Sequence, residues 1–318
     1  GDAGPTPPPP RRDAGEPPSP PGVWRPFADD SPWNTPIPAD VAIRSDSDAL
    51  VEALATSSDW PGLQVAITPW SVPVYEVGGA GVPLVEVHSP ISNEGLEHTF
   101  RWPVPPDAAP APESDAHMTI IDRATGREYD FWAARRRADG SWECGLCSTA
   151  DLDGSGVRPP KGGARPWYES HGSRACGFPL MAGLIRAEEL AAGRIEHALV
   201  LAYPALRRRW FTPPASTGHP DNGLLREDFG IPCGGRVQLD PSVDVDALGL
   251  SPAGRAIARA LQEYGAYVGD FAGSINVYAD GSPEAQAAFA GVLDAGAMHA
   301  LDLGDLRVVE WGELTPDG

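Results

Sequence analysis

Apolar and polar positions alternate over much of the first half of the chain, a pattern that is typical of β-strands. Within residues 63–102, the runs LQVAIT, VPVYEV, PLVEVH and EHTFRW are separated by Pro, Gly and Asn, which predicts short strands joined by turns. Residues 114–132, SDAHMTIIDRATGREYDFW, predict a β-hairpin that turns at Ala124, Thr125 and Gly126. We therefore expect a mainly β fold of the β-sandwich or jelly-roll kind.

The apolar spacing changes to the helical period in a few segments, which predict peripheral helices. Serine followed by proline, as at Ser251 and Ser282, supplies a helix cap and a first turn, and Gly193 is suited to end a helix. The predicted helices are residues 46–57, 186–192, 251–264 and 282–293. An α+β fold is therefore the alternative to the sandwich.

Strand patterns also occur in the second half of the chain. We expect strands at residues 194–203, 207–211 and 306–311, where β-branched and aromatic side chains recur. Residues 266–270 and 274–279 are expected to pair as a second hairpin through Phe271, Ala272 and Gly273.

Residues 1–22 differ from the rest of the chain because they contain the proline runs PTPPPP and EPPSPPG. Such a segment adopts an extended polyproline II conformation without a face that packs, so we expect a disordered tether. Residues 23–318 are expected to form a single β-rich globular domain. Tethers of this kind commonly follow a cleaved signal peptide or a lipid-anchored residue, which indicates a secreted or surface-tethered protein.

The net charge of −20 restricts the partners. A strongly acidic chain repels nucleic acid and anionic lipid, so neither is expected to bind. No apolar run approaches the ~20 residues that a membrane-spanning helix needs. We expect a monomer without a membrane span.

The chain contains four cysteines, which allow three pairings. In an exported protein we expect the disulfides Cys144–Cys147 and Cys176–Cys233. A zinc site would use the same four residues, although the second pair lacks the close spacing of structural zinc ligands. Free thiols are the remaining alternative.

The segment DLDGSG, residues 151–156, matches the first half of a calcium-binding loop, with oxygen ligands at alternate positions. Gly162 stands where a calcium loop of the EF-hand type would have its bidentate glutamate, so this is not an EF-hand. Asp151 and Asp153 are therefore candidate ligands of a structural calcium, and a simple Asp- and Gly-rich turn is the alternative. No cofactor is required.

The first hairpin carries the candidate catalytic groups. Asp115 and His117 are two residues apart, so they share a face of an extended strand. A four-residue turn would place Thr119 opposite Asp130 and bring Asp130 to that face. His197 lies among apolar side chains on another expected strand, where it is either a core histidine or a partner of the site. The candidate substrate-binding residues are Tyr129, Trp132, Trp167 and Arg186.

Several enzyme classes lack their signatures in this chain, because there is no G-x-S-x-G, H-E-x-x-H, P-loop or G-x-G-x-x-G opening a helix. Ten tryptophans favour a site for sugars, which stack on aromatic faces. We expect a secreted enzyme that hydrolyses glycosidic bonds of an extracellular polysaccharide by carboxylate and histidine acid–base chemistry. The alternatives are a polysaccharide lyase with a His or Tyr base and a non-catalytic glycan-binding module.

Two longer segments, GLIRAEELAAGRIEHAL and ALQEYGAYVGDFAG, carry a resemblance. Together with the WNTPI segment and the DAHMTIID hairpin, they resemble a group of secreted bacterial proteins of unassigned function. The resemblance covers most of the chain after the tether. It implies one exported bacterial domain and no particular activity.

Overall fold

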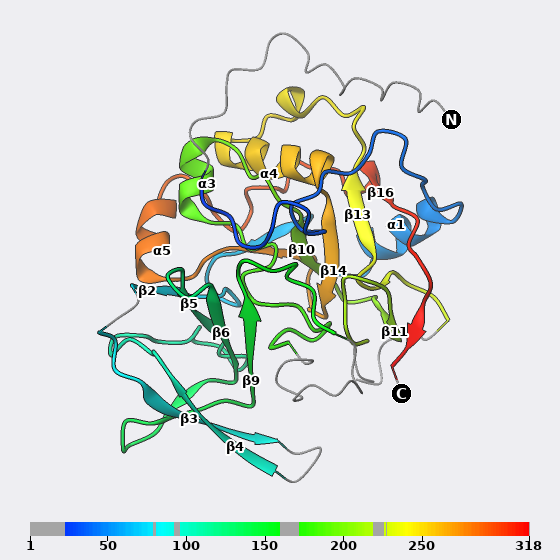
Figure 1. Ribbon diagram of the computed structural model, residues 1–318. Helices are drawn as coiled ribbons and strands as arrows, with labels where there is room; N and C mark the ends of the chain where they lie inside the picture. The colour runs from blue at the N-terminus through cyan, green and yellow to red at the C-terminus, as the bar shows by residue number, and fades with distance from the viewer. Residues whose placement is uncertain are drawn as a thin grey trace, which may run out of the picture.

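The computed structural model describes residues 23–78, 81–91, 96–159, 172–218, 226 and 228–317 (Figure 1). The expected tether, residues 1–22, and Trp167 lie outside the described residues. Apolar side chains gather in two clusters, one around the largest sheet and its helices and a smaller one between residues 77 and 147. The expectation of a single domain over residues 23–318 stays a prediction.

A mixed six-stranded sheet lies in the larger core. In spatial order its strands are β1 (Gln64–Ala66), β15 (Asn276–Tyr278), β10 (Leu199–Ala202), β14 (Ala266–Asp270), β13 (Arg236–Leu239) and β16 (Leu306–Val308). β10 runs parallel to β14 and antiparallel to β15. All four residues of β10 are buried, as expected for a continuous apolar strand that is covered on both faces.

Helices pack around this sheet, mostly on its upper side in Figure 1. α4 (Pro252–Glu263) contacts β13, and α1 (Ser47–Ala55) contacts β16. α3 (Ala187–Ala192) contacts both α4 and α5 (Pro283–Phe289). The hydroxyl of Ser251 accepts a hydrogen bond from the Gly254 N–H and so caps α4. Two 3₁₀ helices, η1 (Val245–Leu248) and η2 (Leu303–Asp305), complete the helical part. All four predicted helices are confirmed, with ends that differ by a few residues.

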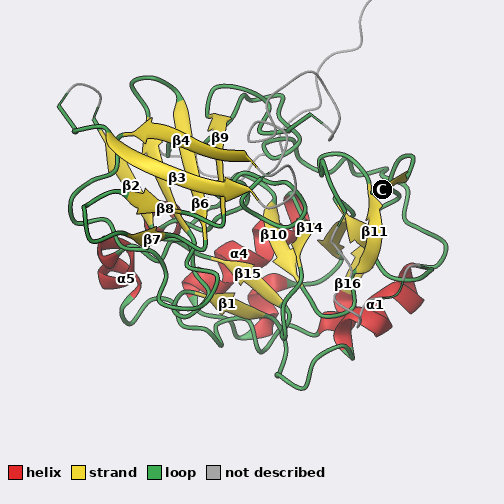
Figure 2. Cartoon of the chain, turned by 90° about the horizontal axis from the view of Figure 1, so that it is seen from below, coloured by secondary structure: helices red, strands yellow, loops and turns green. Residues whose placement is uncertain are grey.

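Two four-stranded sheets enclose the smaller core (Figure 2). The first has the order β2 (Val74–Val77), β5 (Met118–Asp122), β6 (Arg127–Trp132) and β9 (Leu146–Asp151). The second has the order β4 (Leu96–Trp102), β3 (Val85–Ile91), β8 (Trp142–Glu143) and β7 (Arg135–Arg136). The rings of Trp102 and Phe131 meet edge to face, with centroids 5.1 Å apart, and join the two sheets.

The hairpin register follows the prediction, because Thr119 pairs with Asp130 across β5 and β6. A small third sheet has the order β12 (Pro232–Cys233), β11 (Arg207–Phe211) and β17 (Thr315–Pro316). The predicted disulfide Cys176–Cys233 is confirmed, with its Cα atoms 5.4 Å apart, and the structure also pairs Cys144 with Cys147, whose Cα atoms are 5.8 Å apart. Among the described residues, no helix has the length and apolarity to cross a bilayer.

The hairpin predicted from residues 266–270 and 274–279 is wrong. Both segments are strands, β14 and β15, but β10 lies between them and pairs with each. The strand pattern identifies an extended segment without identifying its partner. An apolar strand such as β10 takes a central place because its edges and faces can then all be covered.

The expected β-sandwich or jelly roll is replaced by a mixed arrangement of helices and four sheets, which is closer to the α+β alternative. Alternation of apolar and polar residues determines which face of a strand is buried. It does not determine which sheet the strand joins, and the helices prove to be part of the larger core rather than peripheral additions.

Candidate functional site

A pocket of about 530 Å³ lies where the loop after β14 faces the segment that leads into β5. Both Asp115 and His117 line it, and His117 is 5% exposed. Its walls are formed by β1, by the loop between β14 and β15, and by residues 68–70. The aromatic lining residues are Trp60, Trp70, Phe271 and Tyr278. A concave aromatic pocket that contains titratable groups is a typical small-molecule or glycan site.

The backbone between Asp115 and His117 has an unusual conformation. β5 begins only at Met118, and Ala116 has a φ of 39°, in the left-handed region that non-glycine residues rarely adopt. Two hydrogen bonds fix this segment, from Ala133 N to Asp115 O at 2.7 Å and from Ala134 N to Ala116 O at 3.1 Å. Asp115 and His117 therefore both line one pocket, as expected. A turn at Ala116 brings them there, and not the alternation of side chains along a strand.

His117 is neutral in this setting. Its Nε2 lies 3.1 Å from the carbonyl oxygen of Ser173, and because a carbonyl can only accept, Nε2 carries the proton. Burial, together with the positive charge of Arg174, lowers the pKa of His117 to about 3. Nδ1 is then the unprotonated nitrogen, so it can accept a proton or a hydrogen bond.

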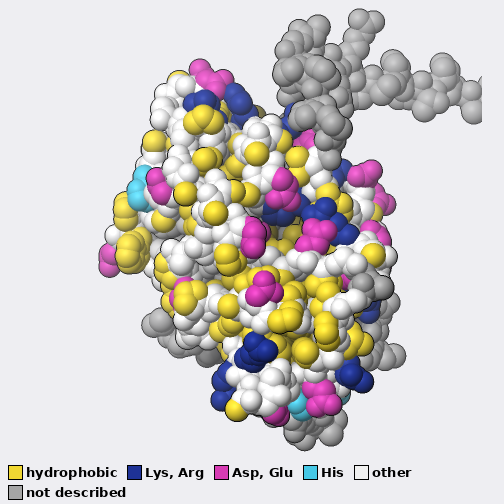
Figure 3. All heavy atoms as spheres, turned by 90° about the vertical axis from the view of Figure 1, so that its left-hand side faces the viewer, with side chains coloured by type: hydrophobic (Ala, Val, Ile, Leu, Met, Phe, Trp, Pro, Cys, Tyr) yellow, Lys and Arg dark blue, Asp and Glu magenta, His cyan; other side chains and the backbone are white. Residues whose placement is uncertain are grey.

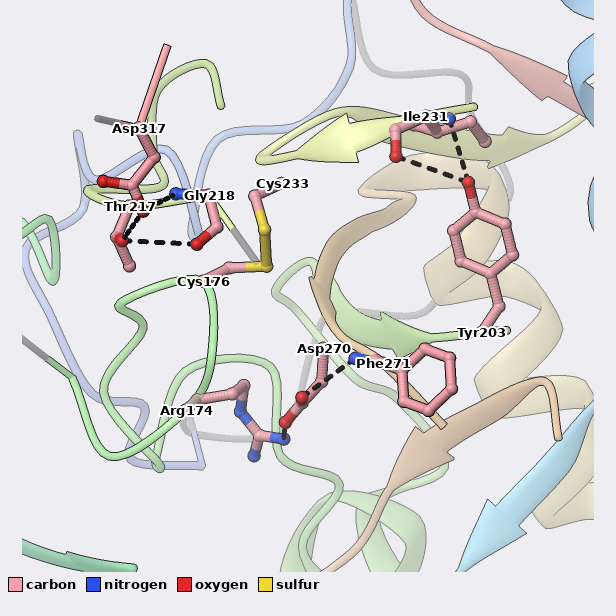
Figure 4. The surroundings of a disulfide bond; sticks show 10 residues. All are labelled: Arg174, Cys176, Tyr203, Thr217, Gly218, Ile231, Cys233, Asp270, Phe271 and Asp317. Atoms are coloured by element: carbon pink, nitrogen blue, oxygen red, sulfur yellow. Dashed lines mark hydrogen bonds and ion pairs between the residues drawn. A yellow bond between two sulfur atoms is a disulfide. The ribbon is translucent and has the colours of Figure 1, made fainter. Parts of the chain in front are cut away.

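Arg174 and Asp270 face each other as an ion pair, next to the wall residue Phe271 (Figure 4). The Arg174 side chain is fully buried, with Nη1 3.8 Å from Asp270 Oδ2 and the guanidinium carbon 4.2 Å from the ring centroid of Tyr278. Within the described part of the chain, none of its three guanidinium nitrogens has a hydrogen-bond partner. Such a group is costly to bury, which indicates that its charge serves the site.

Asp270 ends β14, and its side chain is 15% exposed. Its Oδ1 accepts a hydrogen bond from Phe271 N at 2.9 Å, and Phe271 is part of the pocket wall. Burial raises the pKa of Asp270 to about 6, although the charge of Arg174 acts in the opposite direction. The carboxyl of Asp115 is close enough to raise it further.

The structure places Asp130 away from this pocket, in a fully buried network. Its Oδ1 accepts from Thr119 Oγ1 at 2.8 Å, and its Oδ2 accepts from Leu180 N at 3.2 Å and pairs with Arg158 at 3.3 Å. Burial and the neighbouring Asp130 raise the pKa of Glu128 well above its usual range. Glu128 therefore resists ionisation inside the hairpin.

His197 and Arg186 form a separate group at the start of α3. His197 Nε2 lies 3.0 Å from Glu189 Oε1, which also pairs with Arg186 at 2.7 Å. Burial alone would raise the pKa of Glu189, but His197 and Arg186 bring it down to about 2. Neither His197 nor Arg186 lines the pocket of Asp115 and His117. Both residues pair with glutamates of α3, which lie within eight residues of them in the sequence.

Arg186 lines a second cavity of about 520 Å³ between α3, α5 and β2. Trp24 covers part of it, and the guanidiniums of Arg123 and Arg186 lie 4.0 and 5.2 Å from the Trp24 ring. Figure 3 views this side of the molecule, on which acidic and basic side chains lie among apolar ones. Two of the charge pairs in this lining are Arg123–Glu76 and Arg186–Glu188. Asp280 lines the same cavity, and burial raises its pKa to about 6.

The expected aromatic subsite is also placed differently. Tyr129 packs against Trp102, with ring centroids 5.3 Å apart, and Trp132 is 40% exposed without lining the pocket. Trp60 and Trp70 line it instead, and the sequence analysis did not identify them. Asp270 and Arg174 were missed as well. The position of Asp270 at the end of an apolar strand was a usable signal, whereas the loop sequence around Arg174 offers none.

Asp151 and Asp153 lie in the turn at the end of β9, where Asp151 Oδ1 accepts a hydrogen bond from Asp153 N at 3.0 Å. In the described ranges, no cluster of three or more His, Cys, Asp or Glu residues could hold a metal ion. Calcium binding at this turn stays a prediction.

Comparison of the chain with family models, curated proteins and solved structures finds no match. The resemblance to secreted bacterial proteins therefore stays a prediction, and the function is argued from the site.

Proposed function

We propose that this protein is an exported bacterial enzyme that hydrolyses glycosidic bonds of an extracellular polysaccharide in the pocket of Asp115 and His117. The observation that carries the proposal is that Asp115 and His117 both line one aromatic-walled cavity of about 530 Å³. That volume lies in the range of about 300–1,000 Å³ that suits a ligand of a few rings.

The groups around the pocket fit the chemistry of glycoside hydrolysis. This reaction needs a proton donor for the leaving oxygen and a group that activates water or faces the positive charge of the transition state. Asp270, whose pKa is raised to about 6, precedes the wall residue Phe271 without lining the pocket itself, so we propose that it supplies the proton through one water molecule. The Asp115 carboxylate activates the attacking water, and neutral His117 accepts a hydrogen bond at Nδ1 that orients the substrate.

A polysaccharide lyase is the second candidate, because His117 and Tyr278 line the pocket and Arg174 stacks on Tyr278. A lyase needs a cation that contacts the substrate carboxylate. The Arg174 side chain is fully buried under Tyr278 and already faces Asp270. The arrangement therefore favours hydrolysis.

Export is part of the proposal. The Cys176–Cys233 disulfide is the kind of bond that persists outside the cytosol, and it supports secretion or surface tethering through residues 1–22. The acidic net charge of −20 supports a partner that is neither nucleic acid nor anionic lipid.

The test is a panel of polysaccharides assayed both for new reducing ends and for the ultraviolet absorbance of an unsaturated product. We expect reducing ends alone, and we expect Asp115→Asn and His117→Ala to lower the rate at least about a hundredfold, the usual size of an acid–base contribution. Asp139→Asn, at an exposed turn, is the matched control and should keep the wild-type rate. Both signals together would establish a lyase, and silence across the panel would favour the binding module.

A further inference from the structure

The pocket rim displays two tryptophans that the fold does not bury. Trp60 is 65% exposed, the highest value among the large apolar side chains of the described residues, and Trp70 is 47% exposed. Both line the pocket of Asp115 and His117. Leaving such large apolar faces in water forgoes burial energy of about 25 cal/mol per Å², so their exposure indicates a ligand that covers them.

The backbone holds both tryptophans in place. Trp70 has a φ of 64°, a conformation that costs about 1–3 kcal/mol for a non-glycine residue and is concentrated at ligand sites. On the other side, Trp60 N donates to Ser58 Oγ at 3.1 Å, and Ser58 Oγ donates to Gly273 O at 3.0 Å. The second bond ties the Trp60 loop to the loop after β14. The Trp60 loop is therefore tied to the pocket wall at Gly273, and Trp70 adds a second exposed aromatic face to the lining.

The polar lining of the pocket is uncharged except at the titratable residues Asp115 and His117. Side-chain hydroxyls and amides dominate it: Gln64, Thr68, Ser114, Ser274 and Asn276. In the described lining there is no Lys or Arg, and Asp115 is the one acidic residue. Hydroxyls and amides match the hydroxyls of sugars, whereas a uronate or sulfate would meet the Asp115 carboxylate without a facing cation.

We propose that the pocket binds a neutral polysaccharide, whose sugar rings stack on Trp60 and Trp70 while the linkage between them lies at Asp115 and His117. The inference deepens the proposed hydrolase function and rests on it for the role of the site. Stacking uses the apolar C–H face of each ring, and the amides and hydroxyls select the orientation of the chain.

The experiment separates binding from turnover by using the full chain with His117→Ala, which slows hydrolysis and keeps the Asp115 carboxylate that opposes anionic glycans. Retardation in native gels is measured with soluble neutral β-glucan, xylan and glucomannan, and with alginate and polygalacturonate as anionic glycans. We expect retardation by at least one neutral glycan and by neither anionic one. Adding Trp60→Ala or Trp70→Ala should raise the Kd about tenfold each, the scale of one lost aromatic stacking contact.

Trp132→Ala is the matched control, because Trp132 is 40% exposed outside the pocket, and it should leave the Kd unchanged. Binding of anionic glycans only, binding of no neutral glycan, or equal effects of the three tryptophan variants would each overturn the inference. Reducing-end assays on the wild-type protein judge hydrolysis separately. Tryptophan-dependent binding without hydrolysis would keep the neutral-glycan assignment and reject the hydrolase.

Discussion

The charge state of the pocket is controlled by a residue that does not line it. Arg174 is buried, faces Asp270 at 3.8 Å and stacks on Tyr278. Its positive charge lowers the pKa of His117 and also lowers that of Asp270, which burial raises. Arg174 therefore keeps His117 neutral, as a hydrogen-bond acceptor, and limits how firmly Asp270, the proposed acid, holds its proton.

Replacing Arg174 with methionine should move the pH–activity profile of the hydrolase to higher pH. In the wild type, activity requires neutral His117, above its pKa of about 3, and protonated Asp270, below its pKa of about 6. Loss of the cation raises both pKa values, so both limbs of the bell-shaped kcat/KM profile shift upward. Arg174→Lys retains the charge and should keep the wild-type limbs. A uniform loss of rate in Arg174→Met, with unmoved limbs, would show a purely structural role.

At the scale of elements, the sequence predicts what is local. The helices follow from their own periodicity, with serine caps at α4 and α5, and the register of β5 with β6 follows from their short turn. The position of β10 between β14 and β15 depends on pairing between distant segments, which no local pattern contains. The site divides in the same way: Asp115 and His117 are neighbours in sequence, whereas Trp60, Arg174 and Asp270 come from three remote segments.

The turn that leads into β5 is an element whose geometry can be tested at Ala116. Its φ of 39° is strained for alanine and natural for glycine. Ala116→Gly should therefore leave the unfolding free energy unchanged or raise it by up to about 1 kcal/mol. Ala116→Val should lower it by about 1–3 kcal/mol and reduce kcat/KM, because a β-branched residue resists the conformation that brings Asp115 and His117 together. Urea unfolding and the reducing-end assay measure the two effects; equal stability of both variants would contradict the strain.

At the scale of the whole molecule, the Cys176–Cys233 disulfide joins the loop of Ser173 and Arg174 to β12, beside the end of β14. Figure 4 shows how close the bond lies to Arg174 and Asp270. The same covalent link therefore stabilises the larger core and holds the two residues that set the state of His117, one through its carbonyl and one through its charge.

Removing this bond as Cys176→Ala/Cys233→Ala should lower both stability and activity. The bond spans a sequence separation of 57, and loop-closure entropy for a loop of that size is worth about 4 kcal/mol. The freed loop should also lower kcat/KM, because Ser173 and Arg174 lose their fixed position. Cys144→Ala/Cys147→Ala, with a separation of 3, is the control and should cost about 2 kcal/mol with little change in kcat/KM. Urea unfolding measures the stability of the two double variants, and reducing-end release measures their kcat/KM. Equal losses of kcat/KM in both would show that the site does not depend on the Cys176–Cys233 bond. A loss of kcat/KM in Cys176→Ala/Cys233→Ala alone would show that this bond, which stabilises the fold, also holds the pocket residues in place.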